Sequence, residues 1–311
     1  YFLMDWLSDD EHIALHTSGS TGKPKEIQMP KTAMYASAGR TAAFFNLSEG
    51  DSALLCLPIR YIAGKMMLVR ALVLGLHLDI IPPKTKLTIE KDYTFAALIP
   101  LQANASFDVL GRFKTVLIGG APIPTDLRKR ISKKYKHCIE TYGMTETLTH
   151  VATRIVSDAV IPFKVMPGIG IATDENDRLV LEVPYLPLSP LVTQDVVRLE
   201  GRDSFRLFGR RDWVINSGGM KIFPEDLEEV LTPFIKFPFF FTALPDANLG
   251  EQLVLLVEAP ATEKTAIMAI AQQHLGANKH HIPKQVICMD AFMHTRSGKL
   301  DRKATIKRLN M

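Results

Sequence analysis

The sequence predicts an α/β fold that continues into an α+β region, in a chain of two domains. In the first part, short apolar segments that end at loops are followed by a helix with one apolar face. From about residue 212 the pattern changes to α+β, and a length of 311 residues also favours two domains. We place the boundary between Arg211 and Asp212. This gives a large N-terminal sheet-and-helix domain, 1–211, and a small C-terminal α+β domain, 212–311.

Two buried strands and one amphipathic helix are predicted in the N-terminal domain. Leu54–Pro58 and Thr115–Ile118 are short apolar runs that end at loops, as buried strands do. Thr125 is a suitable N-cap for the helix that follows. The apolar residues of this helix recur at four-residue spacing: Leu127, Ile131 and Tyr135. The basic residues Lys129, Arg130, Lys133 and Lys134 fall on the other side, where we expect water.

A hairpin and a further set of elements are predicted in the rest of the chain. Val196–Leu199 and Phe205–Phe208 flank the turn-forming segment Gly201–Ser204. Pro224 opens a helix whose first turn carries acidic residues, which complement the helix dipole. The remaining predictions are strands at Phe239–Leu244, Leu253–Val257 and Val286–Met289, and a helix at Thr262–Leu275 closed by Gly276.

Composition limits the class of protein. With 47% hydrophobic and 23% charged residues the chain is ordinary globular protein, and a net charge of +4 is too small to indicate nucleic acid as a partner. The three cysteines are far apart and lack C-x-x-C spacing, which fits a reduced, cytoplasmic setting better than a disulfide framework. The longest apolar run, Met66–Ile81, contains charged residues and is not a membrane span.

The segment 16–25 carries the most information about function. It reads His-Thr-Ser-Gly-Ser-Thr-Gly-Lys-Pro-Lys, and its glycines, hydroxyls and lysines suit a polyphosphate. It is not the common P-loop, because its glycines are only three residues apart and a proline follows Lys23. The alternative is a plain Ser/Gly-rich surface loop. The residues expected to contact phosphate are Thr17, Ser18, Gly19, Ser20, Thr21, Gly22 and Lys25.

Two later segments add groups that suit a nucleotide. Gly119-Gly120-Ala121 follows a predicted strand, and glycines there let a flat ring lie against the backbone. The segment from Tyr142 and Gly143 to Thr145 and Glu146 offers an aromatic ring, a glycine, a hydroxyl and a carboxylate. One carboxylate is enough for Mg²⁺ when phosphate oxygens complete its shell. Taken singly, a Gly-Gly pair is more commonly a turn, and Thr145 beside Glu146 a helix cap.

In their order along the chain these segments resemble the adenylate-forming superfamily of acyl-CoA synthetases, luciferases and peptide-synthetase adenylation domains. The resemblance runs from residue 16 to residue 302. It includes Gly209-Arg210-Arg211-Asp212, Ser217-Gly218-Gly219 and the stretch His294–Arg302. It implies the adenylate-forming fold with a mobile C-terminal domain, ATP and Mg²⁺ as cofactors, and CoA as co-substrate.

The resemblance also implies a role for each matching residue. Lys299 is then the adenylation lysine on the C-terminal domain, and Glu146, beside Thr145, binds Mg²⁺. The ribose contacts fall to Asp195 and Arg210, and the hinge between domains to Asp212. Gly218 and Gly219 leave a channel for the pantetheine arm of CoA. The nucleotide contacts implied by the middle segments are Gly119, Gly120, Ala121, Tyr142 and Gly143.

Within the superfamily, Leu57–Gly64 followed by Arg70 resembles the subgroup of o-succinylbenzoate–CoA ligases of menaquinone biosynthesis. This implies that Tyr61, Gly64 and Arg70 contact the acid, with Arg70 pairing with a second carboxylate. The alternative places Arg70 at the surface end of a helix. Tyr61 stands where many members carry histidine, and Gln194 replaces a glycine before Asp195. Only fifteen residues precede the phosphate loop, through natural absence or truncation.

Two other functions stay open at this stage. One is an adenylating enzyme for another aryl or alkyl acid, or for a carrier protein; the other is a non-catalytic nucleotide-binding relative. The expected partners are small molecules, namely a carboxylate, ATP and CoA, with no nucleic acid and no membrane span. A homo-oligomer is left open.

Overall fold

The computed structural model describes residues 2–16, 26–294 and 300–309. The chain forms two compact units. The first comprises Tyr1–Ala172, Val180–Val192 and Leu199–Arg206, and the second Thr173–Leu179, Thr193–Arg198 and Leu207–Met311. Within the described ranges, no helix has the length and apolar character needed to cross a membrane. The domain boundary between Arg211 and Asp212 stays a prediction.

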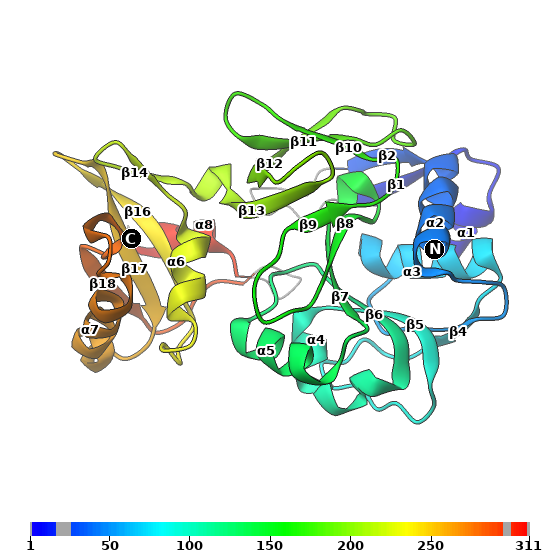
Figure 1. The fold of residues 1–311 in the computed structure, drawn as a ribbon, viewed down its shortest axis with the longest axis horizontal. Helices are drawn as coiled ribbons and strands as arrows, with labels where there is room; N and C mark the ends of the chain where they lie inside the picture. Colours follow the sequence, from blue (N-terminus) through cyan, green and yellow to red (C-terminus); the bar gives the residue numbers. More distant parts are fainter. Residues whose placement is uncertain (1, 17–25, 295–299, 310–311) are drawn as a thin grey trace. The chain divides into compact units, whose positions relative to one another are not determined.

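Parallel strands form one end of the large sheet, in the first unit (Figure 1). In spatial order they are β4 (His77–Ile80), β3 (Ser52–Leu55), β5 (Tyr93–Leu98), β6 (Phe113–Ile118) and β7 (Cys138–Gly143). The antiparallel strands β8 (His150–Ile155) and β9 (Phe163–Val165) then follow β7. Parallel neighbours need crossover connections, and helices α3 (Ile62–Leu74), α4 (Pro100–Ala105) and α5 (Thr125–Lys134) lie in these connections.

The other elements of this half are short or peripheral. They are α1 (Phe2–Leu7), the antiparallel pair β1 (His12–His16) and β2 (Glu26–Pro30), α2 (Lys31–Phe45), and the 3₁₀ turns η1 (Phe107–Arg112) and η2 (Thr145–Thr147). Four more strands contribute residues to both units: β10 (Gly170–Thr173), β11 (Arg178–Glu182), β12 (Leu191–Leu199) and β13 (Ser204–Arg210). Strands β12 and β13 are neighbours in the sheet, so the predicted hairpin is confirmed.

The predicted strand at Thr115–Ile118 is confirmed as β6, but two boundaries were wrong. Strand β3 ends at Leu55 and not at Pro58, because the chain turns at Pro58, whose carbonyl accepts a hydrogen bond from the Tyr61 N–H at 3.1 Å. Helix α5 starts with Thr125 as its first residue. Its N-cap is Pro124, without a side-chain cap bond.

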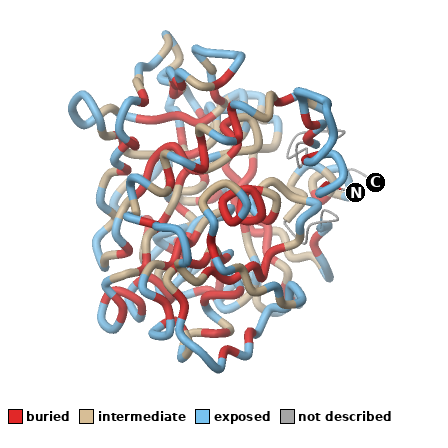
Figure 2. The backbone as a smooth tube through the Cα atoms, turned by 90° about the vertical axis from the view of Figure 1, so that its right-hand side faces the viewer, coloured by how far each residue is buried: buried red, intermediate tan, exposed pale blue. Residues whose placement is uncertain are grey.

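One core cluster of the first unit lies between β3, β5, β6 and the helices beside them. Buried segments, red in Figure 2, run through the interior of the protein. The cluster includes two cysteines, Cys56 and Cys138, which are free thiols with no exposed surface. Burial raises the pKa of the Cys56 thiol to about 12, and that of the Cys138 thiol to about 12 as well. Both side chains therefore act as small apolar residues in the core.

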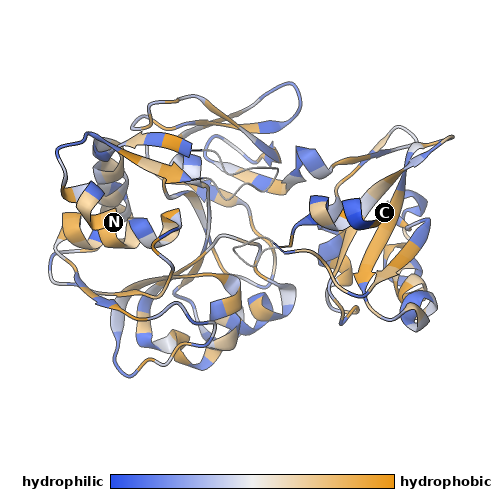
Figure 3. Cartoon of the chain, turned by 180° about the vertical axis from the view of Figure 1, so that it is seen from behind, coloured by the Kyte–Doolittle hydropathy of each residue, from blue (hydrophilic) through white to orange (hydrophobic). Residues whose placement is uncertain are grey.

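The second unit is built on a five-stranded sheet whose apolar strands (Figure 3) contribute to two core clusters, a large one with α6 and α7 and a small one with α8. Its strands are β14 (Ile215–Ser217), β15 (Met220–Ile222), β16 (Phe239–Asp246), β17 (Gly250–Glu258) and β18 (Gln285–Met289). Its helices and 3₁₀ turns are η3 (Arg211–Trp213), α6 (Pro224–Leu231), η4 (Ala261–Glu263), α7 (Lys264–Leu275), η5 (Lys279–His281) and α8 (Arg302–Leu309). The helix opened by Pro224 and the strands at 239, 253 and 286 are confirmed.

Candidate active site

The carboxyl ends of β6 and β7 bring two of the predicted segments together. The two strands are parallel neighbours, with Ile118 opposite Glu140. Gly119 and Gly120 therefore leave β6 beside the end of β7, where Tyr142 and Gly143 lie. The Gly119 N–H donates to the Leu98 carbonyl of β5 at 3.1 Å, which fixes this edge. Ligands of parallel sheets bind at this edge, outside the carboxyl ends of the strands.

Glycine is required at two positions of this edge because other backbone or side-chain atoms lie very close. A Cβ at Gly119 would lie 2.3 Å from Thr141 Oγ1, and a Cβ at Gly143 would lie 2.4 Å from the Thr149 carbonyl oxygen. Gly120 adopts φ +83°, which favours glycine for a different reason. Gly120 and Ala121 are exposed, so their backbone is open to a ligand.

The Tyr142 ring faces the protein rather than the solvent. It is 8% exposed and meets Phe205 edge-on, with ring centroids 5.2 Å apart and planes at 78°. Phe163 lies against the same ring at 5.9 Å. In this arrangement the ring of Tyr142 fixes the end of β7, and its contact with a nucleotide stays a prediction.

A short, tightly bonded loop carries Glu146. The Met144 N–H donates to Thr147 Oγ1 at 2.9 Å, and the Thr147 hydroxyl lies 2.8 Å from the Thr149 carbonyl oxygen. Leu148 takes the uncommon φ of +64° and is fully buried, which anchors the loop. Thr145 and Glu146 are partly exposed at the start of η2, so the carboxylate of Glu146 is available to a cation.

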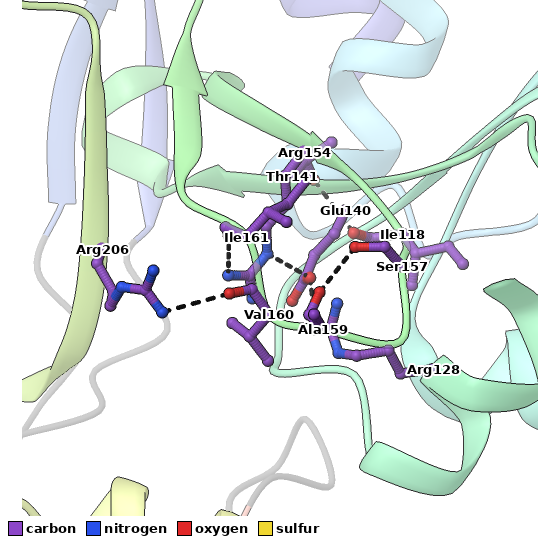
Figure 4. A network of polar contacts seen from close by, with 10 residues as sticks. All are labelled: Ile118, Arg128, Glu140, Thr141, Arg154, Ser157, Ala159, Val160, Ile161 and Arg206. Carbon is purple, nitrogen blue, oxygen red and sulfur yellow. Dashed lines mark hydrogen bonds and ion pairs between the residues drawn. The ribbon is translucent and has the colours of Figure 1, made fainter. Parts of the chain in front are cut away.

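An ion-pair network connects Glu140 of β7 to two neighbouring elements (Figure 4). Glu140 Oε2 lies 2.6 Å from Arg128 Nη2 of α5 and 2.7 Å from Arg154 Nε of β8. Burial would raise the pKa of Glu140, but the bonds and charges of Arg154 and Arg128 together hold it below its ordinary value. Arg154 also donates to the Ile161 carbonyl at 2.9 Å. Strand β7, which carries Tyr142, is therefore fixed by ionised partners from α5 and β8.

Helix α3 positions the three residues expected to contact the acid. Tyr61 is its N-cap residue, and Arg60 lies over the Tyr61 ring at 4.8 Å. A Cβ at Gly64 would lie 2.4 Å from the Pro58 carbonyl oxygen, so glycine allows the first turn to pack on the preceding loop. Nine residues into the helix, Arg70 is buried, with 3% of its surface exposed. The surface alternative for Arg70 was therefore wrong.

Arg70 is a buried cation without a carboxylate partner among the residues that the structure describes. Its Nη2 donates to Thr149 Oγ1, its Nη1 lies 3.6 Å from Met67 Sδ, and its Nε has no hydrogen-bond partner there. Burial lowers the pKa of Arg70 to about 10, against a smaller opposite effect of Tyr185. The guanidinium is still charged at neutral pH. A buried charge of this kind needs an anion beside it.

Thr149 and His150 were missed by the sequence reasoning. The pair directly follows the segment that ends in Thr147, yet a histidine that opens an apolar strand gives no signal of its own. Thr149 Oγ1 lies 3.0 Å from His150 Nδ1 and also accepts from Arg70, 79 residues away in the chain. Only the folded structure brings these three side chains together.

In the second unit, the guanidinium of Arg210 contacts both Asp195, the other residue expected at the ribose site, and Asp212, the expected hinge. Arg210 Nη2 lies 2.9 Å from Asp212 Oδ2, and Arg210 Nη1 lies 3.9 Å from Asp195 Oδ1. Asp195 is 9% exposed, and its N–H donates to Thr193 Oγ1 at 3.1 Å. The backbone of Gly209 passes close to Glu225, whose Oε2 would lie 2.4 Å from a Cβ at that position.

Gly218 and Gly219 form the turn between β14 and β15. Their φ values of +57° and +80° favour glycine at both positions. The Gly218 N–H donates to the Leu249 carbonyl at 2.9 Å, and both glycines are exposed. Eight predicted site residues lie outside the described residues: Thr17, Ser18, Gly19, Ser20, Thr21, Gly22, Lys25 and Lys299.

The chain is similar to known proteins over most of its length. The sequence profile of the family described as AMP-binding enzyme matches residues 6–186. A probable 2-succinylbenzoate–CoA ligase of Mycobacterium tuberculosis is 27% identical over 97% of this chain and 85% of its own. A crystal structure of an acyl-CoA synthetase (AMP-forming)/AMP-acid ligase II-like protein from Dyadobacter fermentans is 33% identical, with a TM-score of 0.63, and the alignment covers 99% of this chain and 92% of that one. The o-succinylbenzoate coenzyme A synthetase of Bacillus subtilis, solved with ATP and a magnesium ion, shares the fold at 20% identity, with a TM-score of 0.80 over 94% of this chain and 69% of its own.

Proposed function

The chain belongs to the family of AMP-binding enzymes, and from this premise we propose that it is an ATP-dependent carboxylate–CoA ligase. The observation that carries the proposal is the edge formed by β6 and β7. There Gly119 and Gly143, each required by a close neighbour, lie beside the partly exposed Glu146. A nucleotide bound at this edge would contact glycine backbone that no side chain covers, and the carboxylate of Glu146.

Mg²⁺ fits this site as an ion shared with the substrate. The described residues contain no group of three or more His, Cys, Asp or Glu that could enclose a metal. An ion held by Glu146 and by phosphate oxygens needs no such group. When bound, it would supply positive charge at the phosphates of ATP.

In the proposed first step, an oxygen of the substrate carboxylate attacks the α-phosphorus of ATP, the bond to the β-phosphate oxygen breaks, and pyrophosphate leaves. Such a transfer depends on positioning and charge neutralisation. Lys299 would neutralise charge between the carboxylate and the α-phosphate. The segment from Thr17 to Lys25 would bind the departing phosphates, and Asp195 with Arg210 would hold the ribose.

In the proposed second step, the thiol of CoA attacks the carbonyl carbon of the acyl-adenylate, and AMP leaves with the bonding electrons. The residues 212–311 would turn about Asp212, withdraw Lys299 and present Gly218 and Gly219 to the pantetheine arm. The exposed turn formed by these two glycines supports this role, because the absence of side chains leaves room there.

We also propose o-succinylbenzoate as the acid. Its support is Arg70, a buried guanidinium that has no carboxylate beside it among the described residues and that would pair with the second carboxylate of this substrate. The relatives named above at 20–27% identity are ligases for the same acid, which agrees with the assignment. With ATP and CoA as substrates, the enzyme would work in the cytoplasm.

The test is release of pyrophosphate from ATP and Mg²⁺ with a panel of carboxylic acids that includes o-succinylbenzoate. We expect release with at least one acid, the highest kcat/KM with o-succinylbenzoate, and thioester formation with free CoA. Transfer to a carrier protein but not to CoA would replace the ligase with a carrier-loading enzyme. Binding of ATP without pyrophosphate exchange for any acid would identify a non-catalytic relative and end the proposal.

A further inference from the structure

A chain of polar contacts lies between two aromatic rings inside the first unit. Arg70 Nη2 donates to Thr149 Oγ1, and the same oxygen lies 3.0 Å from His150 Nδ1. The Arg70 Cζ atom lies 6.0 Å from the centroid of the Phe95 ring, and the ring of Phe45 meets His150 edge-on at 5.7 Å. His150 is 7% exposed and Arg70 3%, whereas Thr149 between them is partly exposed.

We assign the tautomer of His150 from its contact with the Thr149 hydroxyl. The oxygen of this hydroxyl accepts from Arg70, which cannot accept in return, so the hydroxyl hydrogen is free to be donated. The Nδ1 atom of a neutral imidazole is the acceptor within reach. The ring proton of His150 then sits on Nε2. Burial first, and the charge of Arg70 second, lower the pKa of His150 well below its ordinary value, so the ring is neutral at neutral pH.

Two buried donors of this group lack an acceptor. Arg70 Nε and His150 Nε2 have no hydrogen-bond partner among the described residues. Buried donors are almost always paired, because an unpaired one loses its bonds to water without compensation. One guanidinium and one neutral imidazole, both with an N–H to donate, together suit a carboxylate better than a neutral acceptor, because Arg70 also brings charge.

We propose that His150 is a specificity-determining residue, whose Nε2–H and the guanidinium of Arg70 together bind the second carboxylate of the acid, one carried on an aromatic ring. The proposal rests on the proposed function and names the part of the acid that binds at Arg70. The rings of Phe45 and Phe95 lie against His150 and Arg70, so the surroundings of the two donors are aromatic and apolar, which suits an aryl group. The guanidinium contributes a positive charge. The neutral imidazole contributes a directional hydrogen bond and no second charge.

A pair of acids that differ in one carboxylate tests the proposal. o-Succinylbenzoate and 4-oxo-4-phenylbutanoate share the succinyl arm that is activated, but only the first carries the ring carboxylate. We expect the unmodified enzyme to prefer the diacid in kcat/KM for pyrophosphate release. His150→Phe should reduce that preference by about tenfold or more, the loss expected for one bond to a charged group. His150→Gln, which keeps a donor near Nε2, should retain most of it.

The variants of Thr149 and a distant histidine complete the design. Thr149→Val removes the hydrogen that fixes the tautomer and should lower the preference, whereas Thr149→Ser should keep it. The control is His137→Phe, since His137 contacts the Leu110 carbonyl at 2.9 Å, away from this group, and should leave the preference unchanged. Equal preference in the enzyme, His150→Phe and Thr149→Val would overturn the inference while leaving the ligase function intact.

A readout independent of turnover separates the two proposals. In ¹⁵N spectra of the histidines, we expect His150 as the Nε2–H tautomer in the free protein, with a shift when the diacid is added and none with the monoacid. If no acid gives pyrophosphate release but the selective shift is seen, the proposed ligase function is rejected and the proposed carboxylate-binding site is retained. An Nδ1–H tautomer, or the same response to both acids, would reject the role of His150.

Discussion

The burial of Arg70 has the largest consequence of any single side chain for the choice of substrate. Arg70→Ala should raise the KM for o-succinylbenzoate strongly, because a buried carboxylate would lose its partner. The corresponding loss of binding free energy is on the order of 2–5 kcal/mol. The KM for ATP should barely move. The measurement is steady-state pyrophosphate release at varied acid and varied ATP.

Two controls belong with this prediction. Arg70→Met keeps an unbranched side chain of similar length in the core of α3, so it separates loss of charge from loss of packing. A change of less than twofold in the KM for the acid, in a folded Arg70→Met protein, would make Arg70 structural. The substrate would then return to an unspecified carboxylic acid.

Arg70 also shows where sequence reasoning stops. Helix α3 buries Gly64 and all residues from Met66 to Ala71, so nearly every side of the helix is buried. It has no polar stripe that would indicate which way each residue faces. A charged residue in such a helix is expected at the surface, because its partner cannot be identified locally. Thr149 lies 79 residues further along the chain, and its contact with Arg70 exists only once β8 and α3 are packed in one unit.

At the scale of elements, Glu140 links β7 to α5 and β8. Its folded pKa lies below the ordinary value of 4.5, so the stability that it contributes is present above pH 4.5 and is lost as the pH falls through the folded pKa. Glu140→Gln should weaken this acid dependence of the free energy of unfolding. At pH 7 it should destabilise the protein by about 3–5 kcal/mol, because Arg128 and Arg154 stay buried without a carboxylate.

Denaturant unfolding followed at several pH values checks this prediction. The matched control is Asp126→Asn on the same helix α5, because the Asp126 side chain is 83% exposed and its ion pair with Arg130 spans 3.8 Å. This exposed pair should contribute little. If the Glu140→Gln protein keeps the full acid dependence, another carboxylate is responsible for it.

The elements that were predicted correctly are those with strong local signals. Helix α6 begins at Pro224, carries Glu225 and Asp226 in its first turn, and buries Leu227 and Leu231 at four-residue spacing. The boundaries that were wrong lie where local signals compete. Thr125 is a good capping residue, yet it is the first residue of α5, and Pro124 takes the N-cap position without a side-chain cap bond.

At the scale of the whole molecule, the hinge proposal makes a prediction about the order of the two steps. Asp212 lies in η3, and the φ of 3₁₀ turns, about −50 to −70°, is compatible with proline near −65°. Asp212→Pro should therefore hold the backbone and stop rotation, so that adenylate formation survives while transfer to CoA falls. Pyrophosphate release and thioester formation from a pre-made acyl-adenylate are measured separately.

Asp212→Ala is the control for the lost ion pair, since it removes the contact with Arg210 but leaves φ free. It should affect both steps to a similar extent. If Asp212→Pro changes neither step, the boundary between the domains lies elsewhere.

A second prediction at this scale concerns Lys299, whose assignment rests on the resemblance of its sequence segment. Lys299→Ala should lower adenylate formation by ~10²-fold or more, as expected for removal of one charge-stabilising group. Thioester formation from the pre-made adenylate should survive, because the lysine serves only the first orientation. An equal loss in both half-reactions would contradict a scheme with two orientations.

The reactivity of the two buried cysteines reports how often the core of the first unit opens to solvent. A thiol reagent reacts with the thiolate, and neither Cys56 nor Cys138 offers one while the core is closed, with a pKa of about 12 for each. Their labelling rate should therefore follow the population of molecules in which β3 or β7 has opened to solvent. A bound substrate that favours the closed core would slow the reaction, so the affinity of an unlabelled ligand could be obtained from how quickly these thiols are modified.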